Sequence, residues 1–462
     1  MGYIKTISAA LAVAMGLAVL TGCTGGGSPV TSVTSEDTSE VTSTNATQDT
    51  SASDTSLHDT SGAIQVSSDL AVELEVQDLT SDKEEVFRQG YLDFSFDLLK
   101  RCIESSEKDK NTMISPASVM LALDLTAAGA RGNTLAEMTA LFGGAKDPQG
   151  QISYAAYLMK RLNDSEFVKL HAANSIWVNK TVMPEGITPE YAKFVHDMFD
   201  AGSESLTFDP EALSKINGWV NEHTSGMIPK VLDSLDPSMA MLLINAISFE
   251  GKWETQYTEG SVIEEPFTDS SGTKVPVQML NGTSSVYLEN DIATGFIKPY
   301  EGGRYGFVVM LPKDESSDAG KMLSSFDGRT FDEYLRSGQE DLVVRTKMPE
   351  FSYDWDASLV PELQAMGMNT PFTPGADFSG ILDPGEGGGL YIGDVIHKTH
   401  IEVDRNGTKA AAVTAVSLYK NASIVNPKDA KTVFCDRPFA YAIVDLEDMT
   451  PLFIGTVNTI DK

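Results

Sequence analysis

The sequence predicts an α+β fold, because helical patterns come mainly first along the chain and strand patterns mainly later. Capped helical segments fill residues 81–162, whereas short β-type runs occupy most of the chain from residue 305 onward. Between these parts, residues 241–249 (MLLINAISF) are almost continuously apolar, which is typical of a strand covered on both faces. We therefore expect one folded domain, residues 81–462, with this strand at the centre of a sheet.

Cap signals and apolar spacing predict the helices in turn. Ser81 and Glu84 have the spacing of a capping box, which would open the first helix. The apolar face expected for this helix consists of Val86, Phe94, Leu98, Leu99 and Ile103. Ser115 followed by Pro116 predicts the N-cap and first turn of a second helix. Further helices are expected at residues 133–142, 154–162, 190–198 and 210–222.

Alternation of side chains predicts the strands. Residues 168–178 alternate, which indicates a strand with one wet or partnered face. The final two strands are separated by a short acidic segment that suits a hairpin. Besides the central run, strands are expected at residues 305–311, 341–351, 395–403, 439–444 and 452–457.

The N-terminus predicts export and lipid attachment. Residues 1–22 contain Lys5 and an apolar run, 7–20, that is too short to span a bilayer and reads as a signal peptide. Leu20-Thr-Gly-Cys23 resembles the lipobox of bacterial lipoproteins, in which the cysteine is lipidated and becomes the mature N-terminus. The alternative is a soluble secreted protein. A lipidated Cys23 would hold the protein outside the cell at a membrane surface without a spanning helix.

Composition predicts a tether and excludes one class of partner. Residues 23–80 are rich in Ser, Thr, Gly and Asp, and we expect a disordered acidic tether there. The net charge of −32 argues against nucleic-acid binding, because phosphate contacts need clustered Lys and Arg. Beyond Cys23 only Cys102 and Cys435 remain, which rules out a dense disulfide framework but leaves open whether these two pair.

The sequence offers no constellation for catalysis. It has six His, no Gly-x-Ser-x-Gly elbow and no His-Glu-x-x-His helix. His397 and His400 are three apart on an expected strand, so their rings would point to opposite faces. We therefore expect no catalytic residue, no metal site and no cofactor.

The most informative segment is residues 402–420, EVDRNGTKAAAVTAVSLYK. Three consecutive alanines, Ala410, Ala411 and Ala412, have almost no side chain, and Val413 and Thr414 favour an extended backbone. Such a segment could enter the middle of a sheet with little steric resistance. The alternative is a flexible alanine-rich linker between two strands.

Local motifs in a fixed order resemble the serpin family across residues 84–462. The motifs are NTMISPASV (111–119), GARGNT (129–134), INGWV (216–220) with GMI (226–228), NAISFEGKW (245–253), MPEF (348–351), DFSGI (377–381), VIHK (395–398), GT with its alanines (407–412) and RPF (437–439). Their order covers essentially the whole expected domain, and the ordered set is far more specific than any single motif.

The resemblance implies a serpin fold: a large sheet A, two smaller sheets, about nine helices and an exposed reactive centre loop. Inhibitory members of the family are suicide inhibitors of serine or cysteine proteases. The protease cuts the loop and forms an acyl-enzyme, and the loop then inserts into sheet A and distorts the enzyme. The driving force is the release of strain held in the uncut molecule.

The resemblance also implies roles for particular positions. The hinge of the loop would be Gly407, Thr408, Ala410, Ala411, Ala412, Val413 and Thr414. The polar shutter cluster, under the centre of sheet A where strands must part, would be Ser115, Ser118, Asn245 and His397. The breach, where the loop first enters the sheet, would comprise Trp253, Glu350 and Arg405. His397 and Trp253 could equally be ordinary core residues.

Four positions depart from the family pattern. Arg405 and Lys409 stand where the family usually has acidic residues, and Glu350 stands where a basic partner is common. We expect the first ion pair to be kept with exchanged signs, Arg405 to Glu350. Lys409 has no such explanation and should point to solvent after insertion. Val413 is larger than usual but falls in the outward-facing set.

The position of the reactive bond is less sharply defined. Family spacing from Gly407 places it between Tyr419 and Ala422, whereas counting back from Phe434 reaches residues 425–426. Cleavage after Lys420, before Asn421, would suit a trypsin-like enzyme, and cleavage after Tyr419 a chymotrypsin-like or subtilisin-like one. We expect Lys420.

The predicted function is therefore a monomeric, membrane-anchored inhibitor of serine proteases. The alternative is a non-inhibitory serpin that acts as a surface binding or scaffold protein. Bulky or charged inward-facing hinge residues would favour the alternative, and Thr408, Ala410, Ala412 and Thr414 are neither.

Overall fold

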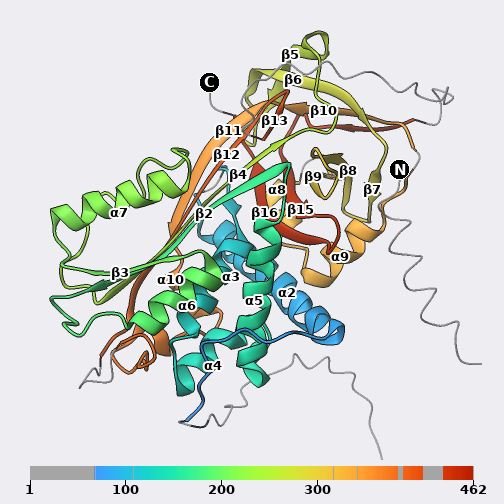
Figure 1. The fold of residues 1–462 in the computed structure, drawn as a ribbon. Helices are drawn as coiled ribbons and strands as arrows, with labels where there is room; N and C mark the ends of the chain where they lie inside the picture. The colour runs from blue at the N-terminus through green and yellow to red at the C-terminus, as the bar shows by residue number, and fades with distance from the viewer. Residues whose placement is uncertain are drawn as a thin grey trace, which may run out of the picture. The chain divides into compact units, whose positions relative to one another are not determined.

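The central apolar run forms strand β4, Met241–Lys252, in the middle of a six-stranded sheet (Figure 1). Its first nine residues are buried, because both faces of the sheet are covered. The strand order is β11-β12-β13-β4-β2-β3. Its other members are β2 (Val168–Asn179), β3 (Gly202–Leu206), β11 (Phe351–Ser358), β12 (Ile392–Val403) and β13 (Gly407–Thr408).

This computed structural model describes residues 67, 69–107, 109–315, 317–340, 342–382, 389–408 and 430–460. The expected signal peptide, Cys23 and most of the expected tether lie outside these residues.

Two smaller sheets complete the β structure. One has the order β1-β16-β15-β9-β8-β7, in which β15 and β16 form the expected C-terminal hairpin. Its strands are Met113–Ile114, Thr450–Val457, Phe439–Asp445, Tyr305–Pro312, Ala293–Pro299 and Tyr287–Glu289. The other has the order β14-β10-β6-β5, with strands Lys431–Phe434, Val344–Pro349, Lys274–Ser284 and Val262–Thr268.

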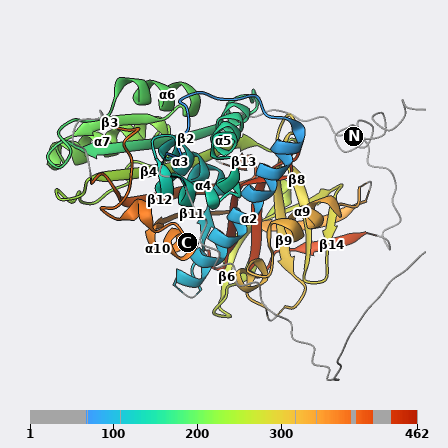
Figure 2. The same ribbon diagram turned by 90° about the horizontal axis from the view of Figure 1, so that it is seen from below.

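Nine α-helices lie within the described residues, and most of the early ones gather on one side of the large sheet (Figure 2). α3 packs on β2 and β4 from this side, whereas α7 covers the opposite face, where Trp177 packs edge-on against Trp219. The helices are α2 (Ser81–Ser105), α3 (Pro116–Ala127), α4 (Gly132–Ala140), α5 (Pro148–Asn163), α6 (Pro189–Phe199), α7 (Pro210–His223), α8 (Ala319–Leu323), α9 (Gly328–Arg336) and α10 (Val360–Ala365).

The predicted α+β class, with three sheets, is confirmed, but several local predictions differ. α2 begins at Ser81 with Thr80 as N-cap and no side-chain capping bond, so the capping box is wrong. Val86 is 62% exposed because the buried stripe passes through Phe87 and Tyr91 instead. The segment 341–351 divides between β10 and β11, and the strands between residues 262 and 299 were not predicted.

Ordered structure also begins earlier than the expected boundary at Ser81. Gln149 on α5 binds the backbone of Glu73 and Glu75, and Ser153 accepts a hydrogen bond from the Gln77 N–H. Val72 is 7% exposed within the main core. The stretch 69–79, expected as the end of the disordered tether, therefore lies along the helical layer.

Within the described part of the chain, no helix has the length and hydrophobicity needed to cross a membrane.

Candidate functional site

The large sheet has a seam that is closed along most of its length and open at one end. β4 and β12 are parallel and pair directly from Met241 with Ile392 to Ser248 with His400. Just beyond, β13 lies between them, with Thr408 opposite Gly251 on β4 and Val403 on β12. The chain that enters this gap is antiparallel to both neighbours. The seam is therefore already parted at one end by two residues.

Two stacked aromatic side chains hold Thr408 in the gap between β4 and β12. Its side chain is 1% exposed, and its Oγ1 lies 2.6 Å from the hydroxyl of Tyr300. The indole of Trp253 stacks on Tyr300 with ring centroids 4.7 Å apart. Gly407 precedes Thr408 where a Cβ would lie 2.1 Å from the Gly251 carbonyl oxygen, so only glycine fits.

Trp253 also holds the turn that leads into β13. Its indole N–H donates to the Asp404 carbonyl at 2.9 Å, and its backbone N–H donates to the Asn406 carbonyl at 2.9 Å. The Asp404 carboxylate accepts from the backbone N–H groups of Asn406 and Gly407, at 2.6 and 3.0 Å. This turn aims the chain into the gap rather than away from it.

Glu350 and Arg405 lie together, but not as the expected ion pair. The Arg405 backbone N–H donates to Glu350 Oε1 at 3.1 Å, and the Arg405 side chain is exposed. No ion pair joins the two side chains among the described residues. Burial raises the pKa of Glu350, and the nearby Asp404 carboxylate adds to this rise. The turn set by Asp404 points the Arg405 N–H, rather than its guanidinium, at the carboxylate.

The four residues of the shutter cluster meet under the closed part of the seam, and all are fully buried. The Ser115 backbone N–H donates to His397 Nε2 at 3.0 Å, and the Ser115 hydroxyl donates to the Leu452 carbonyl at 2.7 Å. The Asn245 side-chain amide donates to Ser118 Oγ. The cluster therefore links α3 to β4, β12 and β16.

Asn174 on β2 is a fifth member that the sequence did not reveal. Its Oδ1 accepts from the Asn245 amide at 2.7 Å and from the Ser118 hydroxyl at 3.2 Å. Asn174 and Asn245 are direct partners in the antiparallel β2–β4 pairing. The only signal for this role is a polar residue on an otherwise apolar face of β2.

The cluster is incompletely satisfied in this arrangement. Asn245 Oδ1 and Asn174 Nδ2 are buried and have no hydrogen-bond partner among the described residues. Each such atom costs roughly 1–3 kcal/mol. Burial lowers the pKa of His397 to about 3, so the imidazole is neutral and Nε2 acts as an acceptor. The groups that hold the seam together therefore have unused hydrogen-bonding capacity.

The remaining predicted site residues cannot be placed. Ala410, Ala411, Ala412, Val413 and Thr414 of the hinge lie outside the described residues. The same holds for Cys23 and for the candidate reactive-bond residues Tyr419, Lys420 and Asn421.

The site thus combines a large sheet with a parted seam, a polar cluster beneath that seam and a two-residue strand that enters it. Residues 89–460 match the sequence model of a family described as Serpin (serine protease inhibitor). The chain belongs to the serpin family. Members of this family act as protease inhibitors or as binding proteins.

Curated relatives extend over most of the chain. An uncharacterised serpin-like protein of Thermococcus kodakarensis is 32% identical over 368 residues, which are 78% of this chain and 83% of that protein. Iripin-8 of the tick Ixodes ricinus is 30% identical over 405 residues, which are 85% of this chain and 98% of that protein.

Solved structures support the same fold. The native state of tengpin, a thermophilic serpin, is 35% identical with a TM-score of 0.73 and covers 86% of this chain and 100% of that chain. Human thyroxine-binding globulin, crystallised with its ligand, has a TM-score of 0.72 over 82% of this chain and 100% of that chain. Its identity is 23%, so this likeness concerns the fold alone.

Proposed function

We propose that this chain is a suicide inhibitor of serine proteases that traps the acyl-enzyme by inserting its cleaved reactive centre loop into the large sheet. The observation that carries the proposal is β13, which already enters the seam antiparallel to both β4 and β12. A cut in the chain beyond Thr408 would release the tether that stops this strand from continuing.

The register of β13 supports insertion at a defined place. The entering strand is antiparallel to β4 and β12. A residue six positions after Thr408 would therefore lie opposite the residues six positions before Gly251 and Val403. Thr414 would then lie between Asn245 and His397, both of the shutter cluster. Thr408 faces the core, so Ala410, Ala412 and Thr414 would follow it on the same face. The Thr414 hydroxyl could there donate a hydrogen bond to Asn245 Oδ1, which has no partner among the described residues.

Insertion would also form more backbone hydrogen bonds than it breaks. The direct β4–β12 pairing would be lost, and the new strand would pair on both sides. At about 1 kcal/mol for each net hydrogen bond, an insertion of ten residues would yield on the order of 10 kcal/mol. That amount is comparable with the whole free energy of unfolding of a domain, about 5–15 kcal/mol. Fixing the inserted residues costs roughly 1–2 kcal/mol each, so burial of the loop's inward-facing side chains must add to this gain.

The chemistry would be interrupted acyl transfer. The protease serine Oγ would attack the carbonyl carbon of the reactive-bond residue, and the amide nitrogen would leave with a proton. Insertion before hydrolysis would keep the ester bond between the two proteins. We propose Lys420 as the residue that supplies this carbonyl, which makes a trypsin-like enzyme the first target to test.

The test is an incubation with trypsin, chymotrypsin and subtilisin, followed by denaturing gel electrophoresis. The proposal predicts an adduct that survives denaturant and has the mass of both proteins minus a small C-terminal fragment. Mass spectrometry of that fragment identifies the cut bond. Cleavage by all three enzymes without adduct would favour the alternative, a non-inhibitory serpin acting as a binding protein at the surface.

We also propose that the inhibitor is held at the outer surface of a membrane through lipid on Cys23. The support is the Leu20-Thr-Gly-Cys23 sequence behind a short apolar run. Metabolic labelling with a radioactive fatty acid should mark the wild-type protein and not Cys23→Ser. Equal labelling of both would contradict lipid attachment at this cysteine.

A further inference from the structure

The turn that leads into β13 contains an asparagine followed by a glycine. In such a pair the glycine backbone nitrogen can attack the side-chain carbonyl carbon of the asparagine, because glycine has no Cβ to obstruct the approach. Threonine follows two of the pairs in this chain, so a difference between those two must come from the fold. The chain has three such pairs, all within the described residues: Asn217-Gly218, Asn281-Gly282 and Asn406-Gly407.

Regular secondary structure holds the first two pairs. The first lies inside α7, and the Asn217 side-chain oxygen accepts from the backbone N–H groups of Val231 and Leu232. The second lies in β6, where Asn281 and Gly282 are paired with β10. Helical and sheet hydrogen bonds fix the backbone between asparagine and glycine, so the glycine nitrogen is held away from the side-chain carbon.

The third pair lies in a turn, which the Asp404 N–H closes by donating to the Gly407 carbonyl at 3.0 Å. Asn406 is partly exposed there, so water can reach it. The Asp404 carboxylate contacts both groups that would react. Its Oδ1 accepts from the Gly407 N–H at 3.0 Å, and its Oδ2 accepts from Asn406 Nδ2 at 2.9 Å.

These contacts place one carboxylate on the attacking nitrogen and on the leaving nitrogen. A general acid or base must lie within hydrogen-bond reach of the proton that it moves, and Asp404 meets this condition for both nitrogens. Among the described residues, no carboxylate is hydrogen-bonded to the side-chain amide of Asn217 or Asn281.

We propose that Asn406-Gly407 is a self-modification site at which Asp404 transfers the proton. The Gly407 nitrogen forms a bond to Asn406 Cγ and gives its proton to the Asp404 carboxylate. The bond from Cγ to Nδ2 breaks, and the nitrogen leaves as ammonia with the proton from Asp404. The succinimide ring that remains takes up one water at either carbonyl, which leaves aspartate or isoaspartate at position 406. The sequence of steps needs water and no oxidant or reductant.

The modification removes the geometry that aims the chain into the seam. A carboxylate at position 406 cannot donate to Asp404, and two carboxylates at this distance repel each other. Isoaspartate also lengthens the main chain by one methylene before Gly407, where a Cβ would already lie 2.1 Å from the Gly251 carbonyl oxygen. Thr408 is therefore displaced from Tyr300. A lower yield of protease adduct follows, and this consequence alone rests on the proposed function.

The experiment incubates the full chain at neutral pH and follows all three pairs by peptide mapping with mass spectrometry. Asn406 should convert from amide to acid, while Asn217 and Asn281 stay unchanged. An isoaspartyl methyltransferase with radioactive S-adenosylmethionine should label the peptide that contains position 406. In urea, which removes the fold, Asn281 should convert as well. No conversion at Asn406, or equal conversion of all three pairs in the folded protein, would overturn the proposal.

Asp404→Asn tests the transfer of the proton. The amide keeps the shape of the side chain but cannot take up a proton, so conversion at Asn406 should slow by at least about tenfold. Asp236→Asn is the matched control, because exposed Asp236 also accepts from a backbone N–H two residues ahead, and its rate should equal wild type. An unchanged rate in Asp404→Asn would refute the role of the carboxylate. A faster rate would show that Asp404 protects Asn406.

Adduct yield separates the chemistry from its consequence. Incubated wild type should lose adduct in proportion to conversion at Asn406, whereas Asn406→Gln, which forms the corresponding ring less readily, should keep its initial yield. Conversion without loss of adduct would contradict the displacement of Thr408 and leave the chemical step standing. Absence of adduct from freshly prepared wild type would instead refute the proposed function.

Discussion

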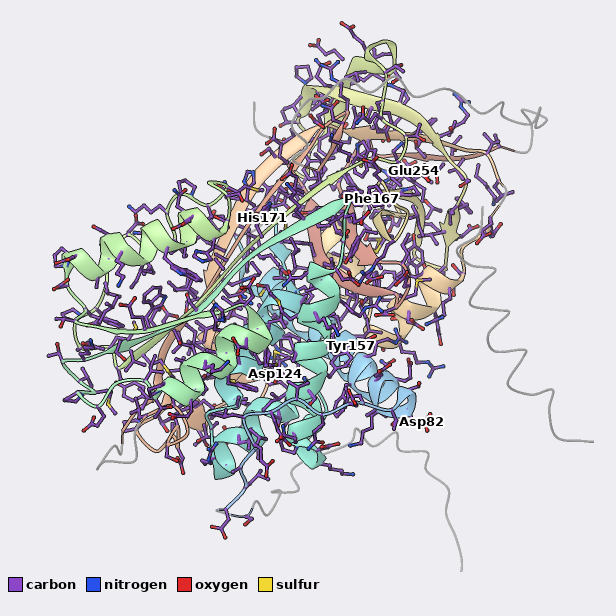
Figure 3. All side chains as sticks on the ribbon, viewed as in Figure 1. Asp82, Asp124, Tyr157, Phe167, His171 and Glu254 are labelled. Atoms are coloured by element: carbon purple, nitrogen blue, oxygen red, sulfur yellow. The ribbon has the colours of Figure 1, made fainter. Side chains whose placement is uncertain are left out.

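A buried acid on α3, Asp124 (labelled in Figure 3), contacts a buried amide on α5, Gln151. Asp124 and Gln151 are both fully buried, and Gln151 Nε2 donates to Asp124 Oδ2 at 2.7 Å. Asp124 Oδ1 and Gln151 Oε1 have no hydrogen-bond partner among the described residues. Burial raises the pKa of Asp124 well above 3.8, and no described charged residue offsets this rise. We infer that Asp124 is protonated and that its O–H donates a hydrogen bond to the Gln151 side-chain oxygen.

This pair makes the free energy of unfolding depend on pH. Between pH 3.8 and the raised pKa, the folded state holds a proton that the unfolded state has released, so stability falls as pH rises. Asp124→Asn has no proton to lose and should gain on wild type by roughly 1.4 kcal/mol for each pH unit in that window. Urea unfolding at pH 4 to 8 measures the difference.

A matched control is Asp82→Asn, because Asp82 is exposed at the start of α2 (Figure 3). Asp82→Asn should not change how the free energy of unfolding depends on pH. If Asp124→Asn and wild type kept a constant difference from pH 4 to pH 8, Asp124 would be ionised in the folded protein and the inference would be wrong.

At the scale of elements, β13 is the part on which the proposed mechanism depends. Its Thr408 is buried beside Tyr300 and opposite Gly251, so a long or charged side chain at this position would be buried as well. An arginine there would have to bury its charge, at a cost of several kcal/mol, or withdraw the strand from the gap. Either outcome slows insertion relative to hydrolysis of the acyl-enzyme.

We therefore expect Thr408→Arg to convert an inhibitor into a substrate, with at least about a tenfold loss of protease adduct. Thr408→Ser, which keeps the hydroxyl near Tyr300, should retain the adduct. Quantitative gels with the reactive protease give both yields. An unchanged yield for Thr408→Arg would show that this position does not enter the sheet during inhibition.

Sequence reasoning succeeded where the information is local or carried by ordered motifs. The central strand, α3 with its Ser115 cap, and the C-terminal hairpin all follow from patterns within about a dozen residues. Asn174 was missed because its place in the polar cluster depends on the β2–β4 register. Stretch 69–79 was missed because its hydrogen bonds lead to residues 76 positions away, which composition cannot reveal.

The contact between Arg405 and Glu350 was also not predictable from the sequence alone. Opposite charges at Arg405 and Glu350 suggested a side-chain ion pair, but the turn set by the Asp404 carboxylate presents the backbone N–H instead. Charge sign is a property of the sequence, whereas the atom that meets a carboxylate depends on local backbone geometry.

At the scale of the whole molecule, the structure combines a closed seam with several features that would favour an additional strand. The seam is parted by two residues, and the polar cluster beneath it has amide atoms without a partner in the described part of the chain. Under the proposed function, these features belong to a fold that is stable but not at its lowest free energy. The cleaved molecule should reach the lower state without any change of sequence.

Differential scanning calorimetry of intact protein and of protein cut in the reactive centre loop tests this claim most directly. The account predicts that the cut molecule melts at a far higher temperature than the intact one, because the loop has become a central strand. A melting temperature equal to or below that of the intact protein would show that cleavage releases no stored energy and would contradict the account.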